Sequence, residues 1–222
     1  MKEEFILKFY KDRSIRVEFK GDKDTKTKVI DVDTLLDCIR KSLLTEAVRS
    51  GLLPENVLSV NIDSKTNARY VVVEFPLNRT DITYMETVYT DFPIPRLVFG
   101  FKLEGNGRID KINMGVVGLG RLKPDTPMYF YPFSNVNFFQ LCVGVNELPH
   151  IESLHQLSGL PYYILSMPDN DDYFKTGNNR LKANHRDLLE HLKDKDRQYY
   201  YDNILVPMHG KTLKDFFEED SL

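Results

Sequence analysis

The residues of this chain whose types and spacing suggest chemistry are Asn135 and Cys142, seven positions apart in residues 132–144, PFSNVNFFQLCVG. A cysteine thiolate attacks carbonyl carbons and forms thioesters. A side-chain amide beside it can donate a hydrogen bond to the oxyanion that develops during the attack. The pair therefore suggests acyl transfer through a cysteine thioester. The alternatives are a half-buried strand cysteine between Leu141 and Val143, and an asparagine that only shapes a turn.

The remaining candidates for chemistry are weaker. Few cationic residues lie near Cys142 in the sequence, which suits a thiol that receives an acyl group from a partner's thioester. A protease cysteine is usually paired with a histidine, and His150 is the candidate for that role. The five histidines and two cysteines form no HExxH or CxxC pattern, so we expect no metal site. The glycines of residues 115–120, GVVGLG, match no phosphate-binding loop, so we expect no nucleotide cofactor.

Composition excludes several classes of protein. The formal net charge of −3 argues against a nucleic-acid partner of the usual basic kind. No apolar run reaches about 18 residues, so we expect no membrane span, and the start of the chain does not resemble a signal peptide. Cys38 and Cys142 are far apart, which is typical of the reducing cytoplasm rather than of a disulfide scaffold. We expect Cys38 to be a packed core thiol.

The first 50 residues predict a hairpin and a helix that pack on a main domain spanning residues 51–222. Two apolar runs in residues 3–19 are joined by a polar turn and predict the hairpin. Residues 21–28 are charged and turn-like. Thr34 and Asp37 have the spacing of a capping box, so we expect a helix from there to about Arg49. Its expected buried stripe is Leu35, Leu36, Ile39, Leu43 and Val48.

The main domain begins with four expected strands in an antiparallel meander. The strands are residues 57–62, 69–75, 96–103 and 108–117, and a Gly-Asn-Gly turn joins the last two. Proline-rich chain follows, so the stretch before Cys142 should be extended. Beyond it the sequence predicts a short helix in residues 151–157, an amphipathic helix in residues 181–192 and a final helix starting near Thr212. The fold class is α+β, an antiparallel sheet with flanking helices.

Several short motifs occur in a fixed order from about residue 50 to residue 217. They are Leu52-Leu53-Pro54-Glu55-Asn56-Val57-Leu58, Pro93-Ile94-Pro95-Arg96-Leu97-Val98-Phe99, Asp125-Thr126-Pro127-Met128-Tyr129, Asn135-Val136 after Pro132, Val143-Gly144 after Cys142, and Leu205-Val206-Pro207 followed by Thr212-Leu213. Together they resemble family D of the prokaryotic ubiquitin-conjugating-like proteins, the family that includes PRTRC system protein B.

The resemblance implies a ubiquitin-conjugating-like fold and a cysteine that accepts a ubiquitin-like modifier as a thioester. In that family of folds an asparagine upstream of the cysteine supports the oxyanion, which places Asn135 and Cys142 in those roles. Phe133-Ser134 stand where the His-Pro pair of that motif would be. The implied partners are a ThiF-type activating enzyme, the modifier and a JAB-type metallopeptidase, encoded together and often on mobile elements.

Two functions from different classes remain open from the sequence. One is a conjugating enzyme that uses Cys142, and the other is an inactive adaptor of the same fold that binds partner proteins. A role in maintenance of a mobile element would rest on neighbouring genes alone. An exposed sulfur near the Asn135 amide favours the enzyme, whereas a sulfur packed under Phe138 and Phe139 favours the adaptor.

Overall fold

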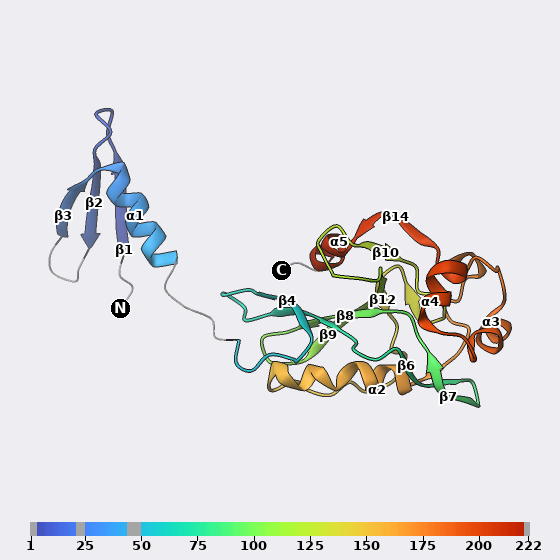
Figure 1. The fold of residues 1–222 in the computed structure, drawn as a ribbon. Helices are drawn as coiled ribbons and strands as arrows, with labels where there is room; N and C mark the ends of the chain where they lie inside the picture. The colour runs from blue at the N-terminus through green and yellow to red at the C-terminus, as the bar shows by residue number, and fades with distance from the viewer. Residues whose placement is uncertain (1–3, 21–24, 44–49, 220–222) are drawn as a thin grey trace. The chain divides into compact units, whose positions relative to one another are not determined.

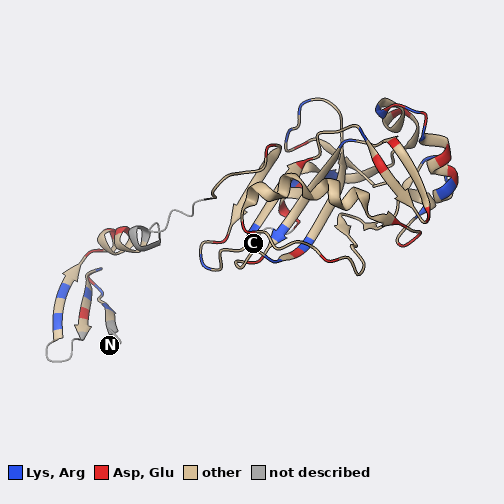
Figure 2. Cartoon of the chain, turned by 90° about the horizontal axis from the view of Figure 1, so that it is seen from below, with Lys and Arg blue, Asp and Glu red and all other residues tan. Residues whose placement is uncertain are grey.

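The computed structural model describes residues 4–20, 25–43 and 50–219. The chain divides into two compact units, Met1–Arg49 and Ser50–Leu222 (Figure 1). Among the described residues, no helix has both the length and the apolar character needed to cross a bilayer. Positive and negative residues are interspersed over the second unit (Figure 2).

The first unit contains the predicted hairpin and one strand more. β1 (Glu4–Phe9) and β2 (Ile15–Lys20) pair antiparallel, and β3 (Thr25–Ile30) pairs with β2. Residues 25–28 are therefore strand, not turn. The prediction failed there because β3 begins with alternating threonine and lysine, which carries no apolar pattern.

Helix α1 (Val32–Leu43) differs from its prediction at its start and in its buried face. Asp31 rather than Thr34 caps it, because the Asp31 carboxylate accepts a 2.6 Å hydrogen bond from the Thr34 N–H. Leu36 and Ile39 are exposed, and Cys38 is exposed too, so the prediction of a packed thiol was wrong. A sheet of three short strands covers only part of a helix surface. The expected continuation to Arg49 lies outside the described residues.

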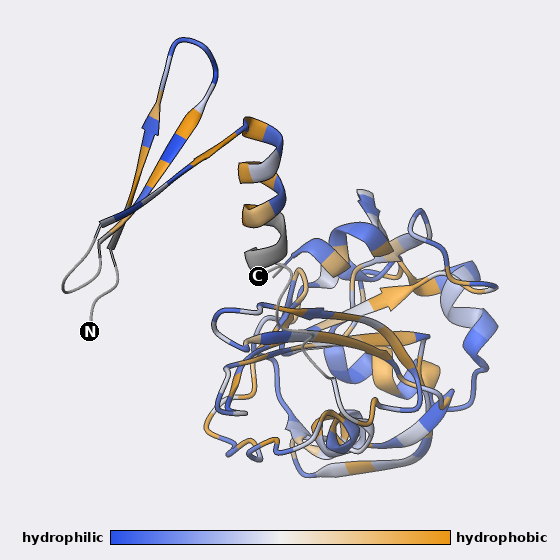
Figure 3. Ribbon diagram, turned by 90° about the vertical axis from the view of Figure 1, so that its left-hand side faces the viewer, coloured by the Kyte–Doolittle hydropathy of each residue, from blue (hydrophilic) through white to orange (hydrophobic). Residues whose placement is uncertain are grey.

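The second unit is built on the predicted meander. β4 (Val57–Ile62), β5 (Arg69–Glu74), β8 (Leu97–Leu103) and β9 (Ile109–Val117) lie side by side in that order, and each pair is antiparallel. The central strands are strongly hydrophobic (Figure 3). Val71 and Val73 face one buried cluster and Tyr70 and Val72 face another, so the sheet is covered on both sides.

A hairpin that the sequence analysis did not predict lies between β5 and β8. It consists of β6 (Arg79–Tyr84) and β7 (Thr87–Pro93). Its two-residue loop, Met85-Glu86, contains no glycine or asparagine, and Met85 has a φ of 53°. The usual sequence signal for a tight hairpin is therefore missing. A short strand, β13 (Pro168–Asp169), pairs with β6 in parallel.

The remaining strands lie beyond β9. β10 (Pro127–Tyr129) pairs with β9 and with β14 (Pro207–Thr212), and a second small hairpin consists of β11 (Val136–Asn137) and β12 (Gln140–Leu141). β12 is attached to β9 opposite Asn113.

The second unit has helical segments at or beside the three predicted places, and further ones that the sequence analysis did not predict at residues 160–166 and 197–204. A 3-10 turn (Leu154–Ser158) leads into α2 (Leu160–Ser166), and α5 (Leu213–Glu218) follows Thr212 as predicted. Helix α3 (His185–Leu192) begins later than expected because Asn184 caps it. The short α4 (Arg197–Tyr199) continues into a π turn (Tyr200–Ile204). Helices α2 and α5 lie on opposite sides of the sheet (Figure 1), which completes an α+β architecture.

Candidate functional site

The β11–β12 hairpin brings Asn135 and Cys142 together. Val136 lies opposite Leu141 in this hairpin, and the next positions outward are the two predicted site residues. The Cys142 N–H donates a 2.7 Å hydrogen bond to the Asn135 carbonyl oxygen. A spacing of seven is therefore what a hairpin with a two-residue loop requires to place these residues across from each other.

The hairpin is fixed to the sheet on one side and to the β13 segment on the other. The Met114 N–H of β9 donates to the Phe139 carbonyl oxygen at 2.7 Å, and the Phe139 ring packs against Phe216 with centroids 5.0 Å apart. Asn135 has a φ of 61°, a left-handed conformation that asparagine tolerates better than most residues. Its N–H donates to the Asp172 carbonyl oxygen at 2.8 Å. The backbone at Asn135 is therefore held by both its N–H and its carbonyl.

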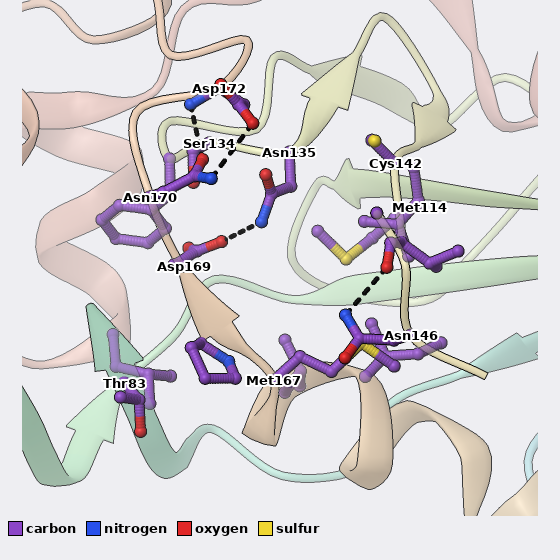
Figure 4. Close-up of a pocket in the computed structure, with 18 of the residues that line it drawn as sticks. Thr83, Met114, Ser134, Asn135, Cys142, Asn146, Met167, Asp169, Asn170 and Asp172 are labelled. Atoms are coloured by element: carbon purple, nitrogen blue, oxygen red, sulfur yellow. Dashed lines mark hydrogen bonds between the residues drawn. The ribbon is translucent and has the colours of Figure 1, made fainter. Parts of the chain in front are cut away.

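Asn135 and Cys142 line one pocket of about 240 Å³ (Figure 4). Cys142 is exposed, and it is not packed under the hairpin tip, since Phe138 is exposed and Phe139 belongs to the cluster on the other side of the sheet. The pocket has apolar walls from β6, β9, α2 and the chain before β8, formed by Ile82, Ile94, Met114, Ile164, Leu165 and Met167. None of the residues that line it is lysine, arginine or histidine.

Asp169, which the sequence analysis missed, contributes a carboxylate to this pocket. Its Oδ1 accepts a hydrogen bond from the Asn135 side-chain amide, Nδ2. Burial raises the pKa of this carboxyl from 3.8 to about 6, and the adjacent Ser134 and Asn135 side chains act in the opposite direction. No cationic side chain of the described residues pairs with it. Asp169 is therefore an ionised carboxylate without a counter-ion at neutral pH.

The chain that carries Asp169 is anchored by aromatic packing around His185. The Nδ1 atom of His185 lies 3.1 Å from the Asn170 carbonyl oxygen and 3.3 Å from the Asp171 carboxylate, which also accepts a 2.9 Å hydrogen bond from the Tyr84 hydroxyl. The His185 ring stacks on Phe174 with centroids 4.8 Å apart. Burial lowers the pKa of His185, so the ring is neutral at neutral pH. His185 supports the wall of the pocket from outside it.

The other histidine considered as a partner for Cys142 lies elsewhere. His150 lines a neighbouring pocket of about 490 Å³ together with Leu148 and Pro149, and it does not line the pocket of Cys142. Among the described residues, no group of three or more His, Cys, Asp or Glu side chains is placed to hold a metal ion.

The pocket therefore combines an exposed thiol, an amide, a carboxylate and apolar walls. The Asn135 amide is directed at Asp169, on the side away from Cys142 (Figure 4). Such a set can form a thioester on Cys142 and bring a second reactant to it, because the pocket is open to solvent beside the sulfur. Comparison with protein-family models, with curated proteins and with solved structures gave no match to this chain, so the assignment of function rests on this geometry and on the sequence.

Proposed function

We propose that this protein is a homologue of the ubiquitin-like-protein conjugating enzymes that carries its modifier as a thioester on Cys142. The observation that carries the proposal is the pairing of Asn135 with an exposed Cys142 at the mouth of a pocket. The position of this pair after a four-stranded antiparallel meander and before the C-terminal helices supports a ubiquitin-conjugating-like fold for the second unit. The setting would be a bacterial or mobile-element conjugation system.

The proposed reaction is a transthiolation. The Cys142 thiolate attacks the carbonyl of the modifier's C-terminal thioester on a ThiF-type activating enzyme. A new carbon–sulfur bond forms at Cys142, the bond to the activating enzyme's cysteine breaks, and the released thiolate takes up a proton. Asn135 would stabilise the tetrahedral intermediate through its side-chain N–H. A JAB-type metallopeptidase would process the modifier or its conjugates.

The test uses the full chain with the candidate activating enzyme, modifier and ATP. We expect an adduct on the wild-type protein that a thiol reductant removes. Cys142→Ala should form none, and Cys142→Ser should form an ester that resists reductant. Cys38→Ser is the matched control, because Cys38 is also exposed but lies in the other unit, and it should form the adduct normally. Formation of the same adduct by Cys142→Ala would refute the assignment of the nucleophile.

A catalytically inactive adaptor is the second candidate. The observation that favours it is the hydrogen bond from the Asn135 amide to Asp169. This bond directs the amide away from Cys142, where it would have to stabilise the oxyanion. An adaptor should bind its partners with the same affinity after Cys142→Ala. The enzyme should lose covalent capture of the modifier in that variant, so pull-down under reducing and non-reducing conditions separates the two.

A further inference from the structure

Asp169 is unusual because it is an acid in a pocket whose lining residues include no lysine, arginine or histidine. The charge of Asp171 acts on it, its own charge acts on the phenols of Tyr84 and Tyr131, and Asp172 and Cys142 line the same pocket. A carboxylate in such a place is costly unless a positive charge joins it, and groups of this kind gather at functional sites. Ser134 is buried beside it, and a hydrogen bond from the Ser134 side chain lowers the pKa of the Asp169 carboxyl. The pocket therefore presents an anion that no cationic side chain of the described residues pairs with, beside a hydroxyl whose oxygen can accept a further hydrogen bond.

We propose that Asp169 is a latch: it holds the Asn135 amide away from Cys142, and a primary ammonium group on an aliphatic chain releases the amide by taking Asp169 as its own partner. This inference rests on the proposed function, because it concerns the acyl group that Cys142 would carry. Asp169 is a positioning residue here, since it acts on the reaction through Asn135.

The backbone geometry limits the motion to one side chain. The Asn135 N–H and carbonyl are both hydrogen-bonded, to Asp172 and Cys142, so its main chain stays where the hairpin puts it. Rotation of the side chain is then the remaining way to bring the amide from Asp169 to the cysteine. Loss of its acceptor on Asp169 is what would permit that rotation.

Charge gives the latch its second effect. An ionised Asp169 beside the thioester disfavours the negative charge that develops on the carbonyl oxygen. An ammonium group that pairs with Asp169 neutralises it, and Ser134 Oγ can accept a further N–H from the same group. The apolar side chains of the pocket suit the methylenes of the chain that carries the ammonium.

The latch would therefore favour amines over water as acceptors. In the step itself the ammonium gives up one proton through Asp169 to solvent, and the neutral amine attacks the thioester carbonyl. The carbon–nitrogen bond forms, the nitrogen releases its second proton to solvent, the bond to the Cys142 sulfur breaks, and the departing thiolate takes up a proton from solvent. Water brings no positive charge to Asp169 and leaves Asn135 latched. A lysine side chain and a free alkylamine share this chemistry.

The kinetic test loads Cys142 with a small acyl group. The probe is the mercaptoethanesulfonate thioester of N-acetylglycylglycine, and mass spectrometry follows hydrolysis of the loaded protein. The thioester on Cys142 should hydrolyse about 10-fold faster in Asp169→Ala than in the wild type. This factor is smaller than the rate effect of one fully placed oxyanion donor. Asp110→Ala is the control, because it removes an exposed acid of β9 that lies outside the pocket, and it should stay within about twofold of wild type. The double variant Asn135→Ala/Asp169→Ala should not show this faster hydrolysis, because it lacks the amide that Asp169→Ala releases. Equal or slower hydrolysis in Asp169→Ala would overturn the latch.

A second readout needs no chemistry at Cys142. The side-chain NH₂ resonances of Asn135 should move when n-butylammonium is added to the wild-type protein, and should not move with tetramethylammonium, which has no N–H. In Asp169→Ala neither salt should move them. Comparison of n-butylamine with N-acetyl-lysine methylamide as acceptors distinguishes a free amine from a lysine. If the probe fails to acylate Cys142, the proposed function fails while the resonances still decide the latch; unmoved resonances in the wild type overturn it.

Discussion

Replacing Asp169 with asparagine should stabilise the second unit at neutral pH and have almost no effect near pH 4. The pKa of this carboxyl is raised from 3.8 to about 6 in the folded protein. Between these two values the folded state binds more protons than the unfolded state. Stability therefore falls as the pH rises through this window, and the whole cost is present above pH 6. Asparagine has no charge to bury, and its carbonyl oxygen can still accept the hydrogen bond from the Asn135 amide.

The magnitude follows from the shift of roughly two pKa units, which corresponds to about 3 kcal/mol as an upper limit. Asp169 is partly exposed, and screening by solvent reduces the expected gain to about 1–3 kcal/mol. With an ordinary urea dependence this moves the unfolding midpoint by about 1 M.

Urea unfolding of the full chain, followed by tyrosine fluorescence at pH 7.5 and pH 4, measures this gain. All tyrosines except Tyr10 lie in the second unit, so the signal reports on the unit that contains the pocket. Asp172→Asn is the control and should change stability by less than about 0.5 kcal/mol, as exposed substitutions usually do. A destabilised Asp169→Asn at pH 7.5, or an equal gain at both pH values, would refute the reasoning.

Two further outcomes test the packing and the exposure of particular residues. Gly100→Ala should destabilise the protein by about 1–3 kcal/mol in the same urea unfolding assay, because a Cβ there would lie 2.2 Å from the Tyr70 hydroxyl. Gly177→Ala, with open space around it, should be nearly neutral in that assay. Iodoacetamide should label both Cys38 and Cys142 in the folded protein, since both are exposed, and mass spectrometry after proteolysis should find two modified peptides. Labelling of Cys38 only after denaturation would contradict its exposed position.

The meander was predictable because its strands carry an apolar pattern and lie near one another in sequence. β5, RYVVVE, and the Asn106-Gly107 turn before β9 each specify their structure locally. The β6–β7 hairpin was not predictable in this way, because the fold forces a positive φ on Met85 without a residue that favours it. Tertiary packing, rather than local preference, determines that turn.

The site was half predictable for a related reason. The spacing of Asn135 and Cys142 is the one that a hairpin with a two-residue loop requires, so the sequence alone could place them together. Asp169 lies in a run of polar residues, PDNDD, that reads as a simple loop. Its place in the pocket depends on a parallel pairing with β6, which itself was not predicted. Helix α1 shows the opposite error, because periodicity predicted burial for Leu36 where the small unit has too little surface to cover it.

The parallel pairing of β13 with β6 also determines when the site can exist. The meander and the β11–β12 hairpin close over short stretches of chain, whereas this pair must form across the 85 positions that separate Thr83 from Pro168. During synthesis Cys142 leaves the ribosome before Asp169 does. In a nascent chain that ends before β13, or in a chain cut between β12 and β13, the Cys142 thiol therefore lies on a complete β11–β12 hairpin without the Asp169 carboxylate beside it. Cys142 is therefore synthesised and placed in its hairpin before the carboxylate side of the pocket can form.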